Sequence, residues 1–571
     1  MHKKIVLISL QHPSQRLVCS RFVGARSLGC REDSTVFMQR IAGFALALCV
    51  AFTLLSERRE AFAELTDKTQ TTSANAGINK SFPDEANDTL PGDGRGDAFT
   101  PGSSLFIIAR DPFRAVRRGR QVFQRKFTRD QGQGPRVNSD STGNLNDPGQ
   151  AGLGAGLADS CAGCHARPRG SAGLGGDVAT RPDSRNTPHL FGVGLREMLA
   201  DEITSDLRAV RANALSQAQA AGTPVTLALT SKGISFGSIT ALPGGTLNTS
   251  GVQGVDPDLR VRPFFAQGGS FSIREFAVGA FKDEMGLEAV DPDLLAAHSG
   301  QRVVTPPGLV LDGSLDTIKA PPVTSESEDG DGDGVVNEIP TSIVDFMEFY
   351  LLNYFPPATY QPNSVSAGLA LFNNIGCGTC HIQNLLIYND RRVANVDTAF
   401  DPAHGIFNRL FSSVTSLALT MSDGSAFPPL RPPGGGSFLV QNIFTDFKRH
   451  DLGDALHERN YDGSIQKLFM TKALWGVGNE AAFGHDGRSI NLTEIILRHS
   501  GEAQAPASKF AQLGEGAKAQ IEDFLRTLVL FPPEDTASNL DPGDLNAADF
   551  PQHGHGSIKL TVLFNNPNDP E

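Results

Sequence analysis

The sequence predicts a mostly α-helical protein built as two lobes, with a β-hairpin insertion and long loops. Helical periodicity recurs in short stretches, and the 571 residues include 60 glycines and 35 prolines, which are typical of turns and loops. A similar helical entry occurs once in each half of the chain, at residues 119–123 (GRQVF) and 368–372 (GLALF). We therefore expect two copies of one structural unit.

The amino-terminal 63 residues are typical of a leader with an export signal. Residues 41–55 form an apolar run that follows Arg40 and precedes an A-x-A cleavage pattern at 61–63. The run is shorter than the ~20 residues that span a bilayer, which disfavours an uncleaved anchor. A start at Met38 would give a conventional signal. The mature protein is expected in the periplasm or outside the cell, without a stable membrane anchor.

The exported part divides by composition and periodicity. Within the first lobe, residues 195–221 have helical periodicity, and residues 223–254 turn to β-branched residues and glycines, which predicts the hairpin insertion. Helices are also expected near 343–352 and at 518–530. The predicted order is a polar arm (64–105), a first lobe (106–350), a second lobe (351–535) and an acidic tail (536–571).

Cysteine use indicates the cofactor. Three of the seven cysteines lie in the leader, and the other four form two CxxCH segments. These are Cys161, Cys164 and His165 in the first lobe, and Cys377, Cys380 and His381 in the second. The spacing lets both thiols bond the vinyl groups of a haem while the histidine becomes the proximal iron ligand. A pair of disulfides, a thioredoxin-like redox pair or a split zinc site would not need the two histidines. We therefore expect two covalently bound haem c groups in two cytochrome c-like haem lobes that share an interface.

A low-spin haem needs a second axial ligand, whereas a catalytic haem keeps that side open. In residues 491–499 the apolar positions 492, 495 and 496 share a helix face with His499, so this histidine is the first candidate for the second lobe. His485 is the second choice and Met470 the third. Trp475, the only tryptophan, is expected to pack on the second haem or in the core. The other histidines considered are His189, His298, His404, His450, His457, His553 and His555.

An acidic connector precedes the second lobe. Asp329, Asp331, Asp333 and Asn337 alternate as in the first half of a calcium loop, but the twelfth position is Pro340 rather than glutamate. A calcium site and a solvated linker are both open interpretations.

The carboxy-terminal pattern resembles a known family. Residues 474–478 (LWGVG), 483–488 (FGHDGR) and 492–499 (LTEIILRH) are similar to the bacterial dihaem cytochrome c peroxidase and MauG superfamily, closest to its dihaem oxidoreductase branch of peroxidases or "thiol oxidoreductases". Residues 185–195, 284–286 and 450–453 also match family motifs. The likeness runs from about residue 119 to 530.

This resemblance implies roles for individual residues. His165 would be proximal to a catalytic haem and His381 to an electron-storing haem, with His499 as the second ligand of the latter. His485 would support the site without binding iron. Glu284 corresponds to the carboxylate that moves peroxide protons. Relatives carry a tryptophan between the haems where this chain has Phe264 and Phe265.

The sequence therefore predicts an enzyme, a peroxidase that reduces hydrogen peroxide at the first haem with electrons from the second. Its partners would be peroxide or dioxygen and an electron-donor cytochrome or small protein. The net charge of −13 argues against nucleic acid or an anionic membrane surface as a partner. The alternatives are a dioxygen-activating oxygenase similar to the rubber oxygenases, a pure electron-transfer cytochrome and a MauG-like maturation enzyme.

Overall fold

The structure is a computed structural model. It describes residues 94–99, 102–128, 131–134, 158–165, 177–178, 185–354, 365–396, 414–416, 419–420, 430–431, 437–460, 463–480, 482–529 and 546–548. The chain separates into two units, Met1–Ala61 and Phe62–Glu571, and the first contains none of these residues. The predicted leader, most of the polar arm and acidic tail, and His404, His553 and His555 lie outside the described residues.

Helices form the larger part of the described secondary structure. The first half contains α2 (Ser104–Arg110), α3 (Pro112–Gln124), α4 (Cys161–Cys164), α5 (Val193–Ala221), α6 (Ile273–Met285), α7 (Pro292–His298) and α8 (Thr341–Asn353). The second half contains α9 (Ser366–Ile375), α10 (Leu492–Arg498), α11 (Gln504–Gln512) and α12 (Glu515–Arg526), with 3-10 turns η6 (Cys377–Thr379), η8 (Asp454–Leu456), η9 (Val477–Asn479) and η10 (Gly501–Ala503).

The sheets of the described residues are small and antiparallel. The three-stranded sheet is β3 (Val225–Ser231), β4 (Ile234–Ala241) and β5 (Leu247–Asn248). The pairs are β1 (Asp177–Val178) with β2 (Arg185–Asn186), β6 (Arg302–Val304) with β7 (Val310–Asp312), β8 (Leu385–Ile387) with β13 (Phe438–Val440), β9 (Ala394–Val396) with β10 (Val414–Ser416), β11 (Leu419–Thr420) with β12 (Leu430–Arg431), β14 (Arg449–Asp451) with β17 (Leu468–Met470), and β15 (Glu458–Arg459) with β16 (Ile465–Gln466).

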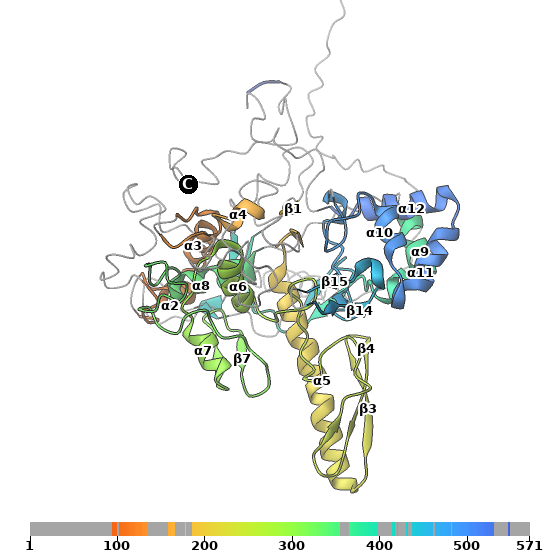
Figure 1. The fold of residues 1–571 in the computed structure, drawn as a ribbon, viewed down its shortest axis with the longest axis horizontal. Helices are drawn as coiled ribbons and strands as arrows, with labels where there is room; N and C mark the ends of the chain where they lie inside the picture. Colours follow the sequence, from red (N-terminus) through yellow and green to blue (C-terminus); the bar gives the residue numbers. More distant parts are fainter. Residues whose placement is uncertain are drawn as a thin grey trace, which may run out of the picture. The chain divides into compact units, whose positions relative to one another are not determined.

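The predicted hairpin insertion is present. Strands β3 and β4 pair in the register Val225 to Ala241, and they lie alongside the long helix α5 (Figure 1). The buried residues of the sheet include Leu229, Phe236 and Ile239. Alternate residues of a strand point to the same side, and a register shift between Phe236 and Ile239 lets both be buried although they are three positions apart. The mostly α-helical prediction is compatible with this structure, although the fold alone does not establish haem lobes.

The described residues pack into two hydrophobic cores. The larger core combines the helices of the first half with residues of the second half such as Val440, Ile443 and Trp475. The smaller core is formed mainly by α9 to α12 and includes Phe372, Phe444, Phe483, Leu492, Phe510, Ile521, Phe524, Leu525 and Leu528. The apolar face expected within 518–530 is therefore buried, although α12 itself runs from 515 to 526.

The repeated helical entries form equivalent helix crossings. A Cβ atom at Gly119 of α3 would lie 2.3 Å from the carbonyl oxygen of Phe346 in α8, and one at Gly368 of α9 would lie 2.0 Å from that of Gln520 in α12. Only glycine lets the paired backbones approach this closely. In each half of the chain, the helix that precedes the CxxCH segment therefore crosses a later helix at a glycine.

The helix expected near residues 343–352 is present as α8, and it packs on α3 and α6 of the first half. One predicted helix end needs adjustment. Helix α10 ends at Arg498, so His499 is its C-cap residue rather than a position within the helix.

Candidate haem-binding sites

The first CxxCH segment forms a single helical turn. The Ser160 hydroxyl caps α4 by accepting a hydrogen bond from the Gly163 amide at 3.1 Å. The His165 ring follows, with Nδ1 2.8 Å from the carbonyl oxygen of Pro188. Because a carbonyl only accepts, Nδ1 carries the hydrogen and Nε2 carries the lone pair that a metal would use.

The second CxxCH segment has the same arrangement. Cys377 begins the short turn η6, and Nδ1 of His381 donates to the carbonyl oxygen of Phe444 at 2.9 Å. Burial lowers the pKa of His381 to about 4, so the ring is neutral near pH 7. A neutral imidazole with Nδ1 tied to a carbonyl is the usual state of a metal-bound histidine.

An aromatic ring from the preceding helix faces each CxxCH histidine. Phe123 lies 6.3 Å from His165 with an interplanar angle of 57°, and Phe372 lies 6.0 Å from His381 at 53°. Each phenylalanine also contacts an aromatic residue of the helix that crosses its own, Tyr350 at 6.0 Å and Phe524 at 5.5 Å. The two segments therefore occupy equivalent surroundings in the two halves of the chain.

The four CxxCH cysteines are thiols rather than disulfides. Burial raises the pKa of Cys161 to about 12 and that of Cys377 to about 11. A thioredoxin-like pair needs a thiol whose pKa is lowered so that the thiolate can attack. The shifts are in the opposite direction, which disfavours the redox-pair alternative.

Glu284 lies close to the first segment although 119 residues separate it from His165 in sequence. It stands near the end of α6, and its backbone carbonyl accepts a hydrogen bond from the amide of Ala158 at 3.1 Å. The pKa of Cys164 is raised by burial and then by the charge of Glu284. The predicted catalytic carboxylate is thus within electrostatic range of the first CxxCH thiols.

His499 lies close to the second segment. Its Nδ1 donates to the carbonyl oxygen of Ile495 at 2.8 Å, so Nε2 carries the lone pair. Burial lowers the pKa of His499, and its charge contributes to lowering that of His381. The two histidines are therefore near neighbours with matching tautomers.

The rival ligands are placed differently. Nε2 of His485 lies 2.9 Å from the carbonyl oxygen of Leu456, and Nδ1 lies 3.0 Å from the carboxylate of Glu458. The ring stacks on Phe469 at 4.0 Å. Both nitrogens of His485 already face oxygen atoms, which favours the supporting role over iron binding. Met470 has its sulfur near Gly268 and packs against the larger core.

Trp475 is a residue of the larger core. Its side chain is fully buried, and its indole nitrogen donates to the carbonyl oxygen of Gln441 at 3.2 Å. Its own carbonyl accepts from Nε2 of His189 at 2.8 Å. Of the two phenylalanines that replace the tryptophan of relatives, Phe264 is buried, whereas Phe265 is 40% exposed.

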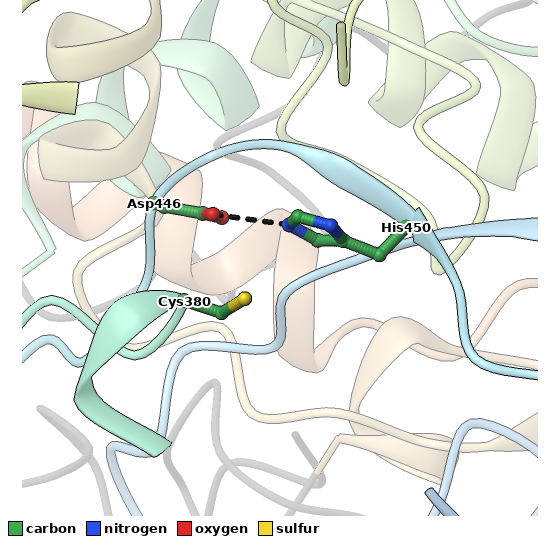
Figure 2. Close-up of side chains that lie close together, drawn as sticks. All are labelled: Cys380, Asp446 and His450. Atoms are coloured by element: carbon green, nitrogen blue, oxygen red, sulfur yellow. Dashed lines mark hydrogen bonds and ion pairs between the residues drawn. The ribbon is translucent and has the colours of Figure 1, made fainter. Parts of the chain in front are cut away.

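His450 forms a polar cluster beside the second CxxCH segment that the sequence analysis did not predict. Its Nε2 lies 3.0 Å from Asp446 and its Nδ1 2.7 Å from Glu502, with Cys380 close by (Figure 2). Burial lowers the pKa of His450, but hydrogen bonds to Asp446, Cys380 and Glu502 outweigh it and raise the value to about 11. The HDLG motif supplied the histidine, but Asp446 and Glu502 carried no recognisable spacing signal.

Comparison with known families identifies the carboxy-terminal part of the chain. Residues 436–528 match the family described as "Di-haem oxidoreductase, putative peroxidase". The match confirms the resemblance to the dihaem peroxidase branch. It includes His450, Trp475, His485 and His499 and begins after both CxxCH segments. No curated protein and no solved structure matches the chain.

The residues present fit the haem cofactors that this family implies. Each CxxCH histidine has Nδ1 held by a backbone carbonyl, and each stands beside half-buried cysteines that are not in disulfides. His499 adds a second imidazole near His381. The donor set of the second site is therefore suited to a six-coordinate iron and that of the first to an iron with one fixed histidine.

The acidic connector forms a compact loop. Oxygen atoms of Asp329, Asp331 and Asp333 lie within 4.8 Å of one another. Asp329 accepts hydrogen bonds from the amides of Gly332, Asp333 and Gly334 at 2.7, 3.0 and 2.9 Å, respectively. Among the described residues, Oδ1 of Asn337 and Oε1 of Glu338 are buried without a hydrogen-bond partner. Pro340 precedes helix α8 and offers no side-chain ligand.

No helix within the described ranges is both long and apolar enough to cross a membrane.

Proposed function

We propose that this protein is an exported dihaem c-type oxidoreductase that reduces hydrogen peroxide at the first CxxCH site with electrons held at the second. The observation that carries the proposal is the repetition of one environment around both segments. In each, a glycine-mediated crossing brings a phenylalanine against the histidine, and a backbone carbonyl fixes the histidine tautomer. The family match at residues 436–528 supports the same class of enzyme.

The two sites differ in a way that suits different tasks. His499 lies near His381 with Nδ1 tied to the backbone, which favours two axial histidines and rapid electron transfer with little reorganisation. The first site has a carboxylate, Glu284, near its thiols instead. A proton-transferring group beside one site and a second imidazole beside the other support catalysis at the first and electron storage at the second.

Bound haem would supply the redox chemistry that a polypeptide lacks. The residues of the chain would hold the cofactor, orient its histidine ligand and transfer protons to and from peroxide. The Pro188 carbonyl orients the His165 ring and increases the basicity of its Nε2. Glu284 would take a proton from the near oxygen of peroxide and return it to the departing oxygen as general base and acid. Two electrons and two protons convert one peroxide to two waters.

The electron donor is proposed to be a cytochrome or another small redox protein in the periplasm or outside the cell. The net charge of −13 favours a donor with a basic contact surface, because unlike charges steer two proteins together. We also propose that the loop at Asp329, Asp331, Asp333 and Asn337 binds calcium, with the buried carboxylates of Glu288 and Glu338 beside it.

The proposal is tested by counting haems and measuring peroxide consumption. The chain is expressed with the cytochrome c maturation machinery and analysed by intact mass and by pyridine haemochrome absorption after denaturation. Two haems per chain are expected. Cys161→Ser with Cys164→Ser should remove one haem and abolish peroxide turnover while the second haem stays reducible. Protein without covalent haem, or a fully loaded protein that does not consume peroxide with any reductant, would overturn the proposal.

A further inference from the structure

A continuous series of covalent and hydrogen bonds joins the two CxxCH histidines. Nδ1 of His165 donates to the Pro188 carbonyl at 2.8 Å, and the next residue, His189, donates from Nε2 to the Trp475 carbonyl at 2.8 Å. Leu474, the residue before Trp475, donates its amide N–H to the carbonyl oxygen of Ile443 at 3.0 Å. The carbonyl oxygen of Phe444, the residue after Ile443, accepts a hydrogen bond from Nδ1 of His381 at 2.9 Å.

The central part of this path is buried, whereas Pro188 at the His165 end is exposed and Leu474 is half-buried. The exposed fraction is 4% for His189, 1% for Trp475 and 0% for both Ile443 and Phe444. Water therefore does not compete for the hydrogen bond from His189 to the Trp475 carbonyl, which is the step that joins the two halves of the chain. The covalent stretches of the path are also short, because each chain segment contributes only one or two residues between consecutive hydrogen bonds.

The phenylalanines in the segment where relatives have a tryptophan do not supply such a connection. The Phe264 ring lies 5.0 Å from that of Phe276 at an interplanar angle of 44°, and Phe265 is 40% exposed. Neither residue takes part in the hydrogen bonds between His165 and His381. A phenylalanine ring is also harder to oxidise than an indole, so a different route between the sites is needed.

We infer that electrons pass between the two haem sites along the path Pro188, His189, Trp475, Leu474, Ile443 and Phe444, a role that rests on the proposed dihaem function. With haem bound, the iron held by His381 would give up one electron and be oxidised by one unit. The iron held by His165 would accept that electron and be reduced by one unit. Every hydrogen bond keeps its donor, so no proton moves along the path.

An aromatic route is the main competitor. Phe123, Tyr350, Tyr354 and Phe191 form consecutive ring contacts of 6.0, 4.7 and 5.5 Å between the first site and the region of His189. Oxidation of a tyrosine releases its phenolic proton, which requires an acceptor. The Tyr350 hydroxyl is buried beside the Tyr354 phenol and the Arg120 guanidinium, neither of which is a general base, so this route lacks a base where one is needed.

The test measures the rate of electron transfer between the haems by transient absorption after rapid photoreduction, without peroxide. His189→Phe keeps a ring but removes the donor, and the rate should fall by at least roughly tenfold, or about 1.4 kcal/mol in activation free energy. His189→Leu provides a second donor-free variant if the first does not assemble. His189→Gln, which retains an N–H donor, should restore part of the rate.

Tyr350→Phe is the matched control, because it keeps the ring of the competing aromatic route and removes only the hydroxyl. Its transfer rate should equal that of the unmodified protein. A wild-type rate in both donor-free variants, or an equal slowing in Tyr350→Phe, would overturn the inference. Because the measurement needs no peroxide, a protein that binds two haems but lacks peroxidase activity still reports on the path.

Discussion

At the scale of single residues, the tautomer of a histidine decides which nitrogen can reach a metal. His165, His381 and His499 each donate Nδ1–H to a backbone carbonyl, which leaves the lone pair on Nε2. His485 instead directs its Nε2 to the Leu456 carbonyl. The ring nitrogen that is bound to a backbone carbonyl thus distinguishes the candidate ligands from a histidine that supports the fold.

We predict that His499→Ala converts the second haem from low spin to high spin while the protein still binds two haems. The loss of the second imidazole leaves the iron with one fixed axial ligand. The measurement is an optical and EPR spectrum of the ferric protein. His485→Ala is the control and should keep the low-spin signals. A low-spin second haem in His499→Ala would contradict the assignment.

Glu284→Gln should reduce kcat/KM for peroxide by roughly 10²–10⁴, the usual contribution of general acid–base catalysis. Glutamine preserves the size of the side chain but cannot take and return a proton. Steady-state peroxide consumption measures the effect, with haem content as the check on assembly. Asp283→Asn, on the same helix, should retain activity. Equal activities of Glu284→Gln and the unmodified protein would remove this carboxylate from the reaction.

At the scale of elements, two glycines set the distance between paired helices. At Gly368 an added Cβ would lie 2.0 Å from the carbonyl oxygen of Gln520 and 2.8 Å from Cβ of Phe524. Phe524 in turn contacts Phe372, whose ring faces His381. A change in this crossing is therefore transmitted to the second CxxCH segment through two phenylalanines, Phe524 and Phe372.

Gly368→Ala should destabilise the smaller core by about 1–3 kcal/mol, since overpacked backbones must move apart. Haem attachment at Cys377 and Cys380 should fall in parallel. Thermal unfolding and intact mass measure the two effects. Gly516→Ala, in the partner helix with nothing within 4 Å of the added Cβ, should be neutral or slightly stabilising. Similar unfolding temperatures for the two variants would show that the crossing tolerates a methyl group.

From the acidic loop we expect that the effect of calcium on the stability of the protein depends on pH. Burial raises the pKa of Glu338 to about 8, the backbone hydrogen bond from Glu288 opposes this shift, and the charges of Asp331 and Asp333 add to it. The folded state therefore holds this proton more tightly than the unfolded state. The resulting stability is complete below about pH 4.5 and is lost as the pH rises through about 8.

In a chelator, the unfolding temperature should fall by a few degrees between about pH 5 and 8, and calcium should restore it mainly at the higher pH. Glu338→Gln should flatten the pH dependence and weaken the calcium effect. Glu326→Gln, at an exposed site in the same connector, is the control. An unfolding temperature that calcium does not change at either pH would favour the solvated linker.

At the scale of the whole molecule, one segment connects the two cores. In residues 443–447, Ile443 and Phe447 belong to the larger core and Phe444 to the smaller one. The same segment accepts the hydrogen bonds of His381 and of the residue before Trp475. A further hydrogen bond of 2.9 Å joins the Asn186 side chain to the carbonyl of Ala482. The cores are therefore bonded to each other close to the second CxxCH site.

The proposed enzyme should consume peroxide equally well in air and under argon, because peroxide itself is the oxidant. An oxygenase similar to the rubber oxygenases would instead need dioxygen and an organic substrate. Stopped-flow measurement of peroxide loss in the two atmospheres, with reduced donor in excess, distinguishes them. Activity that disappears under argon would favour the oxygenase alternative. A protein inert toward peroxide, with both irons six-coordinate, would be a pure electron carrier.

Local patterns in the sequence were sufficient for several features. The CxxCH spacing, the two glycine-phenylalanine entries, the hairpin insertion and the apolar face around residue 521 all depend on neighbours a few positions apart. The peroxidase resemblance depended on contiguous motifs in the same way, and the family match at 436–528 confirmed it. The end of α10 was missed, because the cap residue decides where a helix stops.

By itself, the sequence determined the two CxxCH segments and the candidate residues that could act beside them, because an attachment motif of this kind depends only on local spacing. Tertiary structure alone decided which groups meet. It placed Glu284 near Cys164, His499 near His381, and Asp446 and Glu502 on His450. It also joined His189 to Trp475 across 286 positions. Such contacts arise when separate segments bury a common core, and no local pattern encodes which carbonyl a buried histidine will find.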